Sequence, residues 1–196
     1  MDPLQIATIT DSRVGRVFVT SAALLALASC ISGDTNSPAT NASEPTVPSA
    51  SLTAPQSPVD DAKGRALTAY LGMWDDFVAA AATSDWQSPN LGRYATGIAL
   101  STLSRGLYAD HYNGLVSKGS PTHNAQVSSV DPAVDPAKVI ISDCSDSTNA
   151  LKYRADNGQR ADDGPGGRRL IKATVEKQSD GSWKVSSFGV QGVGTC

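Results

Sequence analysis

The hydrophobic pattern of this chain changes once, near Gly119, from a helical to a strand period. Before that point apolar side chains recur at spacings of three and four residues, and after it short runs are rich in Val, Ile, Thr and aromatic residues. Helices followed by strands, with no alternation of the two, predict an α+β fold in which N-terminal helices pack on a curved antiparallel sheet.

The first helix is expected to begin at Asp60 and Asp61, whose carboxylates suit a helix N-terminus. Its apolar stripe predicts that Trp74 and Phe77 face inward, that Asp76 faces solvent and that Asp75 lies at the border. Aromatic side chains on or near these helices are therefore candidates for lining a ligand pocket, although such stripes more often form plain core. The candidates are Tyr70, Trp74, Phe77 and Tyr94.

A second helical segment is expected to start at Ser88 and Pro89 and to run to Leu103, because serine caps helices and proline suits their first turn. Gly106 weakens this pattern, so residues 107–116 are predicted to form a separate short helical piece that ends near Gly119.

Five strands are predicted in the C-terminal half, with turn residues between them. Asp180-Gly181 lies between two alternating runs and predicts a tight hairpin, and Asp156-Asn157-Gly158 predicts a further turn. Residues 161–167 are charged and rich in glycine, and they predict a mobile loop. The expected strands cover residues 122–130, 138–143, 151–155, 170–177 and 183–190.

The N-terminus resembles a bacterial lipoprotein signal peptide. Arg13 and Arg16 precede an apolar run that is short for a membrane span, and the run ends in Leu-Ala-Ser-Cys at residues 27–30, which matches the bacterial lipobox. The resemblance implies cleavage before Cys30, lipidation of its thiol and anchoring at the extracytoplasmic face of the cell membrane. The alternative is an ordinary signal peptide with a chance cysteine.

Three segments follow from these patterns: a signal peptide at 1–29, a linker at 30–60 and an α+β envelope domain at 61–196. The linker is rich in Ser, Thr, Pro and Ala and has almost no large apolar side chains, so it is predicted to be disordered. With Cys30 lipidated, export leaves Cys144 and Cys196, which permit a single disulfide in an oxidising compartment. The alternative is two free thiols.

The domain also resembles a family of small lipoproteins of high-GC Gram-positive bacteria with a nuclear-transport-factor-two-like fold. The resemblance covers about residues 62–196 and rests on an aromatic first helix, a Val-Ile-Ile-Ser-Asp-Cys-x-Asp element at 139–146, an Asp-Gly-Ser-Trp-Lys-Val hairpin at 180–185 and the terminal Cys196. It implies a cone-like fold, often with an apolar cavity, which serves both isomerase- or cyclase-type enzymes and non-catalytic binding modules. Fold alone does not choose between them.

The search for catalytic chemistry yields few candidates. Asp75 and Asp76 on the first helix, and Asp110 with His111, are carboxylates and a histidine that a cavity enzyme could use, but a solvated face explains them as well. His111 and His123 do not form a zinc set, and no hydrolase motif is present in the sequence. No catalytic residue, metal ligand or cofactor is therefore assigned.

The net charge of −3 and the absence of a basic cluster in the sequence exclude a nucleic-acid footprint. We therefore expect a lipid-anchored, non-catalytic binding or accessory module of the cell envelope, with the membrane, an apolar small molecule or an envelope protein as partners. The alternative is a small isomerase or cyclase that uses a cavity carboxylate or histidine.

Overall fold

A computed structural model describes residues 57–161 and 166–196, which belong to one compact unit, Ser51–Cys196. The predicted signal peptide, Cys30 and nearly all of the predicted linker lie outside the described residues, as do residues 162–165 of the predicted loop.

Helix α1 spans Pro58–Ala81, two residues longer at its start than the sequence predicted. Its N-cap is Ser57, whose hydroxyl accepts a hydrogen bond from the Asp60 backbone N–H at 3.1 Å. Pro58 occupies the first turn, where its missing N–H costs nothing. The expectation that Asp60 itself would cap the helix was therefore wrong: Asp60 lies in the first turn and supports the cap.

The second helical region is divided differently from the prediction. Helix α2 covers only Leu91–Tyr94, while α3 runs from Gly97 to Tyr112 without a break at Gly106. The chain leaves α3 at Gly114, whose φ of 63° suits the residue after a helix end. Residues Leu115–Lys118 then form strand β1, so the predicted helical piece over 107–116 was wrong in its second half.

The strands form two antiparallel sheets. A four-stranded sheet has the order β2-β3-β5-β6, and a two-stranded sheet pairs β1 with β4. The hairpin between β5 and β6 turns at Gly181, as predicted. The remaining strands are β2 (Ala125–Asp131), β3 (Lys138–Asp146), β4 (Leu151–Arg154), β5 (Arg168–Lys177) and β6 (Trp183–Val190).

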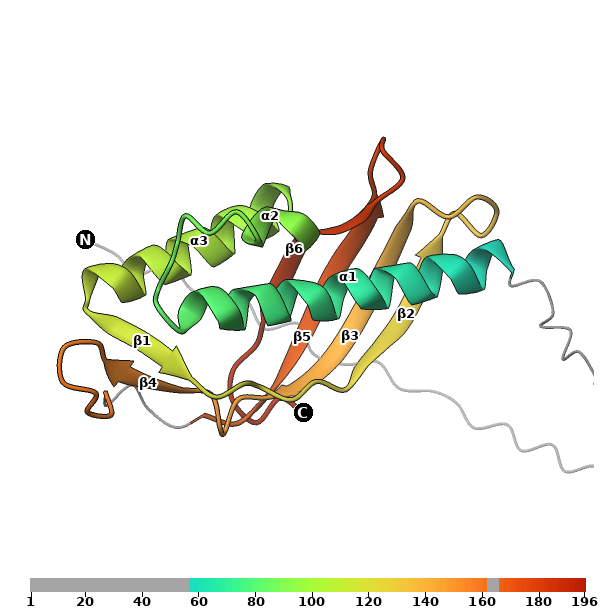
Figure 1. Ribbon diagram of the computed structural model, residues 1–196. Coiled ribbons are helices and arrows are strands. Elements are labelled where there is room, and N and C mark those ends of the chain that lie inside the picture. Colours follow the sequence, from blue (N-terminus) through green and yellow to red (C-terminus); the bar gives the residue numbers. More distant parts are fainter. Residues whose placement is uncertain (1–56, 162–165) are drawn as a thin grey trace, which may run out of the picture. The chain divides into compact units, whose positions relative to one another are not determined.

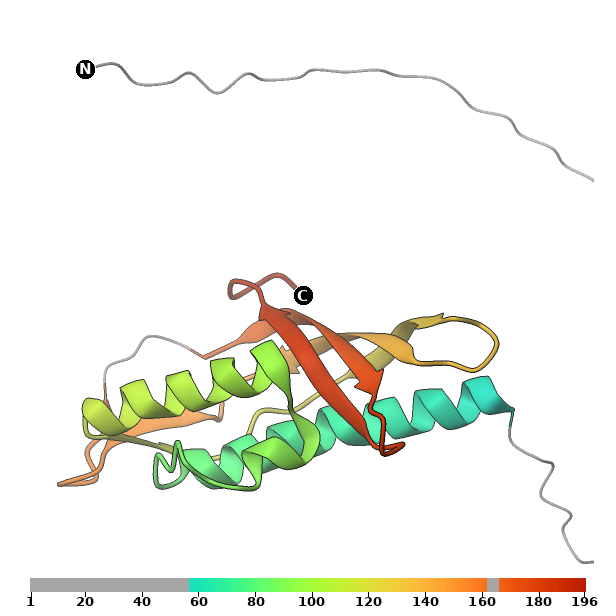
Figure 2. The same ribbon diagram turned by 90° about the horizontal axis from the view of Figure 1, so that it is seen from above.

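Helix α1 lies across one face of the four-stranded sheet, with α2 and α3 beside it (Figure 1). The view from above shows the helices on one side of the strands (Figure 2). The side of α1 that faces the sheet carries small residues, Ala62, Ala66 and Ala69, which allow a close approach, and then larger ones, Tyr70 and Met73. The structure therefore has the predicted α+β fold, with helices packed on antiparallel strands.

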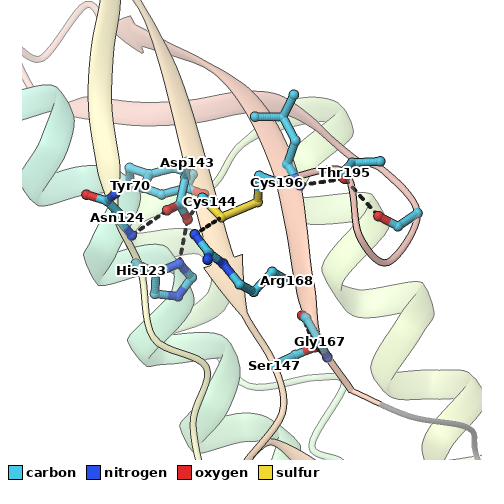
Figure 3. The surroundings of a disulfide bond; sticks show 12 residues. Tyr70, His123, Asn124, Asp143, Cys144, Ser147, Gly167, Arg168, Thr195 and Cys196 are labelled. Carbon is cyan, nitrogen blue, oxygen red and sulfur yellow. Dashed lines mark hydrogen bonds and ion pairs between the residues drawn. A yellow bond between two sulfur atoms is a disulfide. The ribbon is translucent and has the colours of Figure 1, made fainter.

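A disulfide joins Cys144 on β3 to Cys196, with 5.8 Å between the two Cα atoms, as the sequence predicted. The C-terminal segment after β6 also bonds to the start of β5, since the Leu170 N–H donates to the Thr195 hydroxyl at 2.9 Å. The chain end is thereby fastened to the sheet (Figure 3).

Candidate functional site

A cavity of about 360 Å³ lies between the C-terminal half of α1 and the strands. This volume falls within the range of small-molecule sites, about 300 to 1,000 Å³. Its lining comes from helices α1 and α3, from the strands and from the segments between the strands, so the fold as a whole assembles it. The α1 residues that line it are Trp74, Phe77, Val78 and Ala81.

Most of the cavity wall is apolar and aromatic. The Trp74 ring meets the rings of Phe77 and Phe188 edge-on, with centroid distances of 5.8 and 5.3 Å. Ile171 of β5 and Val190 of β6 extend the apolar wall on the sheet side. Such a surface favours an apolar ligand, because contact removes the apolar area of both partners from water.

A hydrogen-bonded cluster centred on Asp143 lies behind this wall. Asp143, on β3, is completely buried. Its carboxylate accepts hydrogen bonds from the Tyr70 hydroxyl at 2.9 Å and from the Asn124 backbone N–H at 2.7 Å, and it lies 2.6 Å from Nδ1 of His123. Figure 3 shows Tyr70 of α1 and His123 and Asn124 of the segment before β2 converging on Asp143 of β3.

Burial alone would raise the pKa of Asp143, but the hydrogen bonds from His123, Tyr70 and the Asn124 backbone outweigh burial and hold that pKa below its usual value. For Tyr70, burial and the neighbouring Asp143 charge raise the pKa far above its usual value. Asp143 is therefore ionised at neutral pH and Tyr70 is protonated. An ionised carboxylate only accepts hydrogen bonds, so Nδ1 of His123 is the donor in its contact with Asp143.

His123 joins the buried cluster to the cavity. Its ring lines the cavity and stacks on Trp74 at 5.7 Å, with 22° between the planes. Its Nε2 atom is buried, and within the described residues it has no hydrogen-bond partner, as is also true of Nε1 of Trp74. Two unpaired polar atoms thus belong to two stacked residues of one cavity wall, where burying a polar group without a partner is costly.

The opposite part of the lining is polar. Asp110 on α3 and Lys152 on β4 form an ion pair at 2.6 Å. Arg169 on β5 is half-buried and pairs in register with Ser145 on β3, whose residue is 6% exposed. The cavity is therefore amphipathic: its aromatic part comes mainly from α1, and its polar part comes from α3 and from strands β3, β4 and β5.

The four residues that were predicted to line a pocket lie in three different places in the structure. Trp74 and Phe77 line the cavity, while Tyr70 lies one layer deeper, bound to Asp143. Tyr94 lies elsewhere: it packs over Gly72 and lines a shallower groove on α1 together with Arg93.

The predicted acid and base candidates also separate. Asp75 and His111 are exposed. Asp76 is buried and its carboxylate binds the Arg93 guanidinium, so the expectation that it faces solvent was wrong. The partner that buries it comes from α2, which the stripe of α1 alone does not reveal. Asp110 does line the cavity.

The pairing of His123 with Asp143 was not predicted from the sequence. The two residues are 20 positions apart, and His123 was predicted to lie in a strand over 122–130, whereas the observed strand β2 begins at Ala125. One signal was present: Asp143 lies in an alternating strand at a position that the pattern places inside, and a carboxylate there requires hydrogen-bond partners.

Within the described ranges, no group of three or more His, Cys, Asp or Glu side chains is placed to hold a metal ion. In the same ranges no helix is long and apolar enough to cross a membrane.

No family model and no curated protein matches the chain. Among solved structures, the intermembrane space region of the chloroplast protein ARC6 is 15% identical, with 64% of this chain and 95% of that chain covered and a TM-score of 0.41. A ketosteroid isomerase-like protein from Erwinia carotovora atroseptica is 10% identical, with 66% and 94% covered and a TM-score of 0.41. For both structures, the sequence identity and the TM-score are too low to assign an activity or a ligand to this chain.

Proposed function

We propose that this protein is a lipid-anchored envelope protein of the nuclear-transport-factor-two-like type, whose domain binds a small, largely apolar molecule without transforming it. The observation that supports binding is the cavity of about 360 Å³ with Trp74 and Phe77 on its helical wall. Its apolar surface and size suit a ligand with a short acyl or ring system.

Binding in the cavity can be tested with a substitution that fills the cavity and leaves the residues of the core in place. Val78 lines the cavity and is half-buried, whereas the adjacent Ala79 is exposed on α1. Calorimetry with 1-decanol should show saturable binding to the purified full chain. Val78→Trp should weaken that binding at least ten-fold, and the matched control Ala79→Trp should leave it unchanged. Equal binding by wild type and Val78→Trp would place the ligand elsewhere.

The anchoring proposal rests on the lipobox that ends at Cys30. Cys30→Ala should leave the chain as unprocessed precursor or release it from the membrane fraction of the producing cells, because no thiol then takes the lipid. Normal processing and complete membrane retention of Cys30→Ala would refute anchoring through this residue.

A second candidate function is proton transfer, because one specific arrangement favours it. Asp143 orients His123 and would stabilise its imidazolium form, which is the role of a carboxylate behind a general base. Against this candidate, Nε2 of His123 is buried, so this atom exposes almost no surface toward the cavity. We therefore place binding first.

The two candidates differ in the fate of the ligand. Under the binding proposal, ligand recovered after prolonged incubation is chemically unchanged and shows no exchange of carbon-bound hydrogen in deuterated water. Exchange that disappears in His123→Gln, with decanol affinity retained, would instead establish the proton-transfer function.

A further inference from the structure

The charges of the side chains that line the cavity do not sum to zero. Asp110 and Lys152 neutralise each other at 2.6 Å. Arg169 lines the same cavity, and within residues 57–161 and 166–196 it takes part in none of the ion pairs. Arg169 therefore leaves the side chains that line the cavity with an excess of positive charge.

The position of Arg169 is fixed by strand alternation. Arg169 and Ile171 are two residues apart on β5, so their side chains leave the same face of the sheet, the face that lines the cavity. Across the strand pair, Arg169 is in register with Ser145 of β3, which also lines the cavity. The side chains of Arg169 and Ser145 thus leave neighbouring positions on the same face of the sheet and line the same cavity as Ile171.

A half-buried guanidinium beside apolar groups is poorly hydrated, and it is stabilised most by an anion that accepts two parallel hydrogen bonds. The wall from Trp74 to Ile171 at the same time prefers hydrocarbon. A ligand with one anionic oxygen-containing group on an apolar body would bind Arg169 and the apolar wall at the same time.

We propose that the ligand is an amphipathic anion, with its carboxylate or phosphate head on Arg169 and Ser145 and its apolar body against Trp74 and Phe77. This inference rests on the proposed binding function and deepens it by naming the ligand class. Carboxylates and phosphate esters share the chemistry that Arg169 recognises.

Four probes with the same ten-carbon tail test the head group on the purified full chain by calorimetry: decanoate, decyl phosphate, 1-decanol and decylamine. A hydrogen bond to a charged group is worth about ten-fold or more in affinity. Decanoate, decyl phosphate or both should bind at least ten-fold more tightly than decanol, and decylamine should bind more weakly than decanol. The ratio of the two anions distinguishes a fatty-acid source from a phospholipid-like source.

Arg169→Gln should bring the affinities of the anions to within about three-fold of that of decanol, while decanol affinity stays the same and reports an intact cavity. Arg168→Gln is the matched control, because Arg168 is exposed, does not line the cavity and instead donates to Cys144 Sγ at 3.3 Å (Figure 3). Arg169→Lys keeps the charge and should retain part of the preference.

Equal affinity of the wild-type chain for decanol and both anions, or an undiminished preference in Arg169→Gln, would overturn the anionic head group and leave apolar binding standing. If none of the four probes binds, the proposed binding function itself fails, and the head-group inference fails with it.

Discussion

At the scale of single residues, the buried carboxylate of Asp143 holds three parts of the chain together. Its oxygens meet Tyr70 from α1, His123 from the segment before β2 and the Asn124 backbone. A buried charge is tolerated only with several such partners, because its desolvation is otherwise too costly. The cluster therefore sets where Trp74 and His123 stack and so shapes one wall of the cavity.

Asp143→Asn should lower the free energy of unfolding at pH 7 by about 3 kcal/mol, because it weakens charge-assisted hydrogen bonds in a buried place. The folded pKa of Asp143 lies below its unfolded value of about 3.9, so its stabilisation is present above about pH 4 and is lost as pH falls through the folded pKa. Urea unfolding at several pH values should show that the difference in free energy of unfolding between the wild type and Asp143→Asn becomes smaller below about pH 4. A difference in free energy of unfolding that stays constant with pH would contradict a stabilising role of the ionised Asp143 carboxylate.

The sequence allowed Trp74 and Phe77 to be predicted as inward-facing, because their spacing is a property of one helix. It did not reveal the roles of His123 and Asp76, whose partners Asp143 and Arg93 belong to other elements. Side-chain pairing between elements depends on how they pack, and no local period encodes it.

At the scale of secondary-structure elements, the predictions that were confirmed rest on local periodicity, and those that failed depend on pairing between elements. Long amphipathic α1 and the alternating strands β3, β5 and β6 were predicted with small boundary errors. Strand β1 was missed because four residues are too few to display a period, and its pairing with β4 is non-local. Its anchor to the end of α1, a hydrogen bond from the Ser84 hydroxyl to the Leu115 carbonyl, is likewise a tertiary contact.

The packing of α2 on α1 predicts opposite effects for two glycines of α1. A Cβ at Gly72 would lie 2.5 Å from Cε2 of Tyr94, whereas a Cβ at Gly64 would meet nothing within 4 Å. Gly72→Ala should therefore destabilise the protein by about 1 to 3 kcal/mol through overpacking. Gly64→Ala should stabilise it by up to about 1 kcal/mol through helix propensity. Thermal unfolding measures both, and stabilisation by Gly72→Ala would show that Tyr94 moves aside freely.

At the scale of the whole molecule, the disulfide closes a loop of 52 residues that contains the end of β3 and all of β4, β5 and β6. In the chain-entropy view, such a loop contributes about 4 kcal/mol by restricting the unfolded chain. The Cys144→Ala, Cys196→Ala double variant should lose roughly that amount in denaturant unfolding. Wild type measured in reductant provides the matched comparison, and a loss below about 1 kcal/mol in both would contradict a stabilising role.

The packed core and the proposed binding surface occupy different parts of the fold. The helix and sheet cores bury small and aliphatic residues, while the cavity collects aromatic rings at one side and Arg169 with Ser145 at the other. Trp74 and Phe77 lie on α1, Ser145 on β3 and Arg169 on β5, so these lining residues are positioned by the same packing that stabilises the domain. This arrangement suits selective binding of an amphipathic molecule.

The central claim, that a ligand occupies the cavity beside Trp74, is tested most directly by quenching of tryptophan fluorescence. The chain has three tryptophans, of which Trp74 lines the cavity and Trp183 lines a separate groove. A decanol brominated at its terminal carbon quenches only a tryptophan that it contacts. We predict saturable quenching in the wild-type chain that disappears in Trp74→Phe and persists in Trp183→Phe. Quenching that persists in Trp74→Phe and disappears in Trp183→Phe would contradict the account.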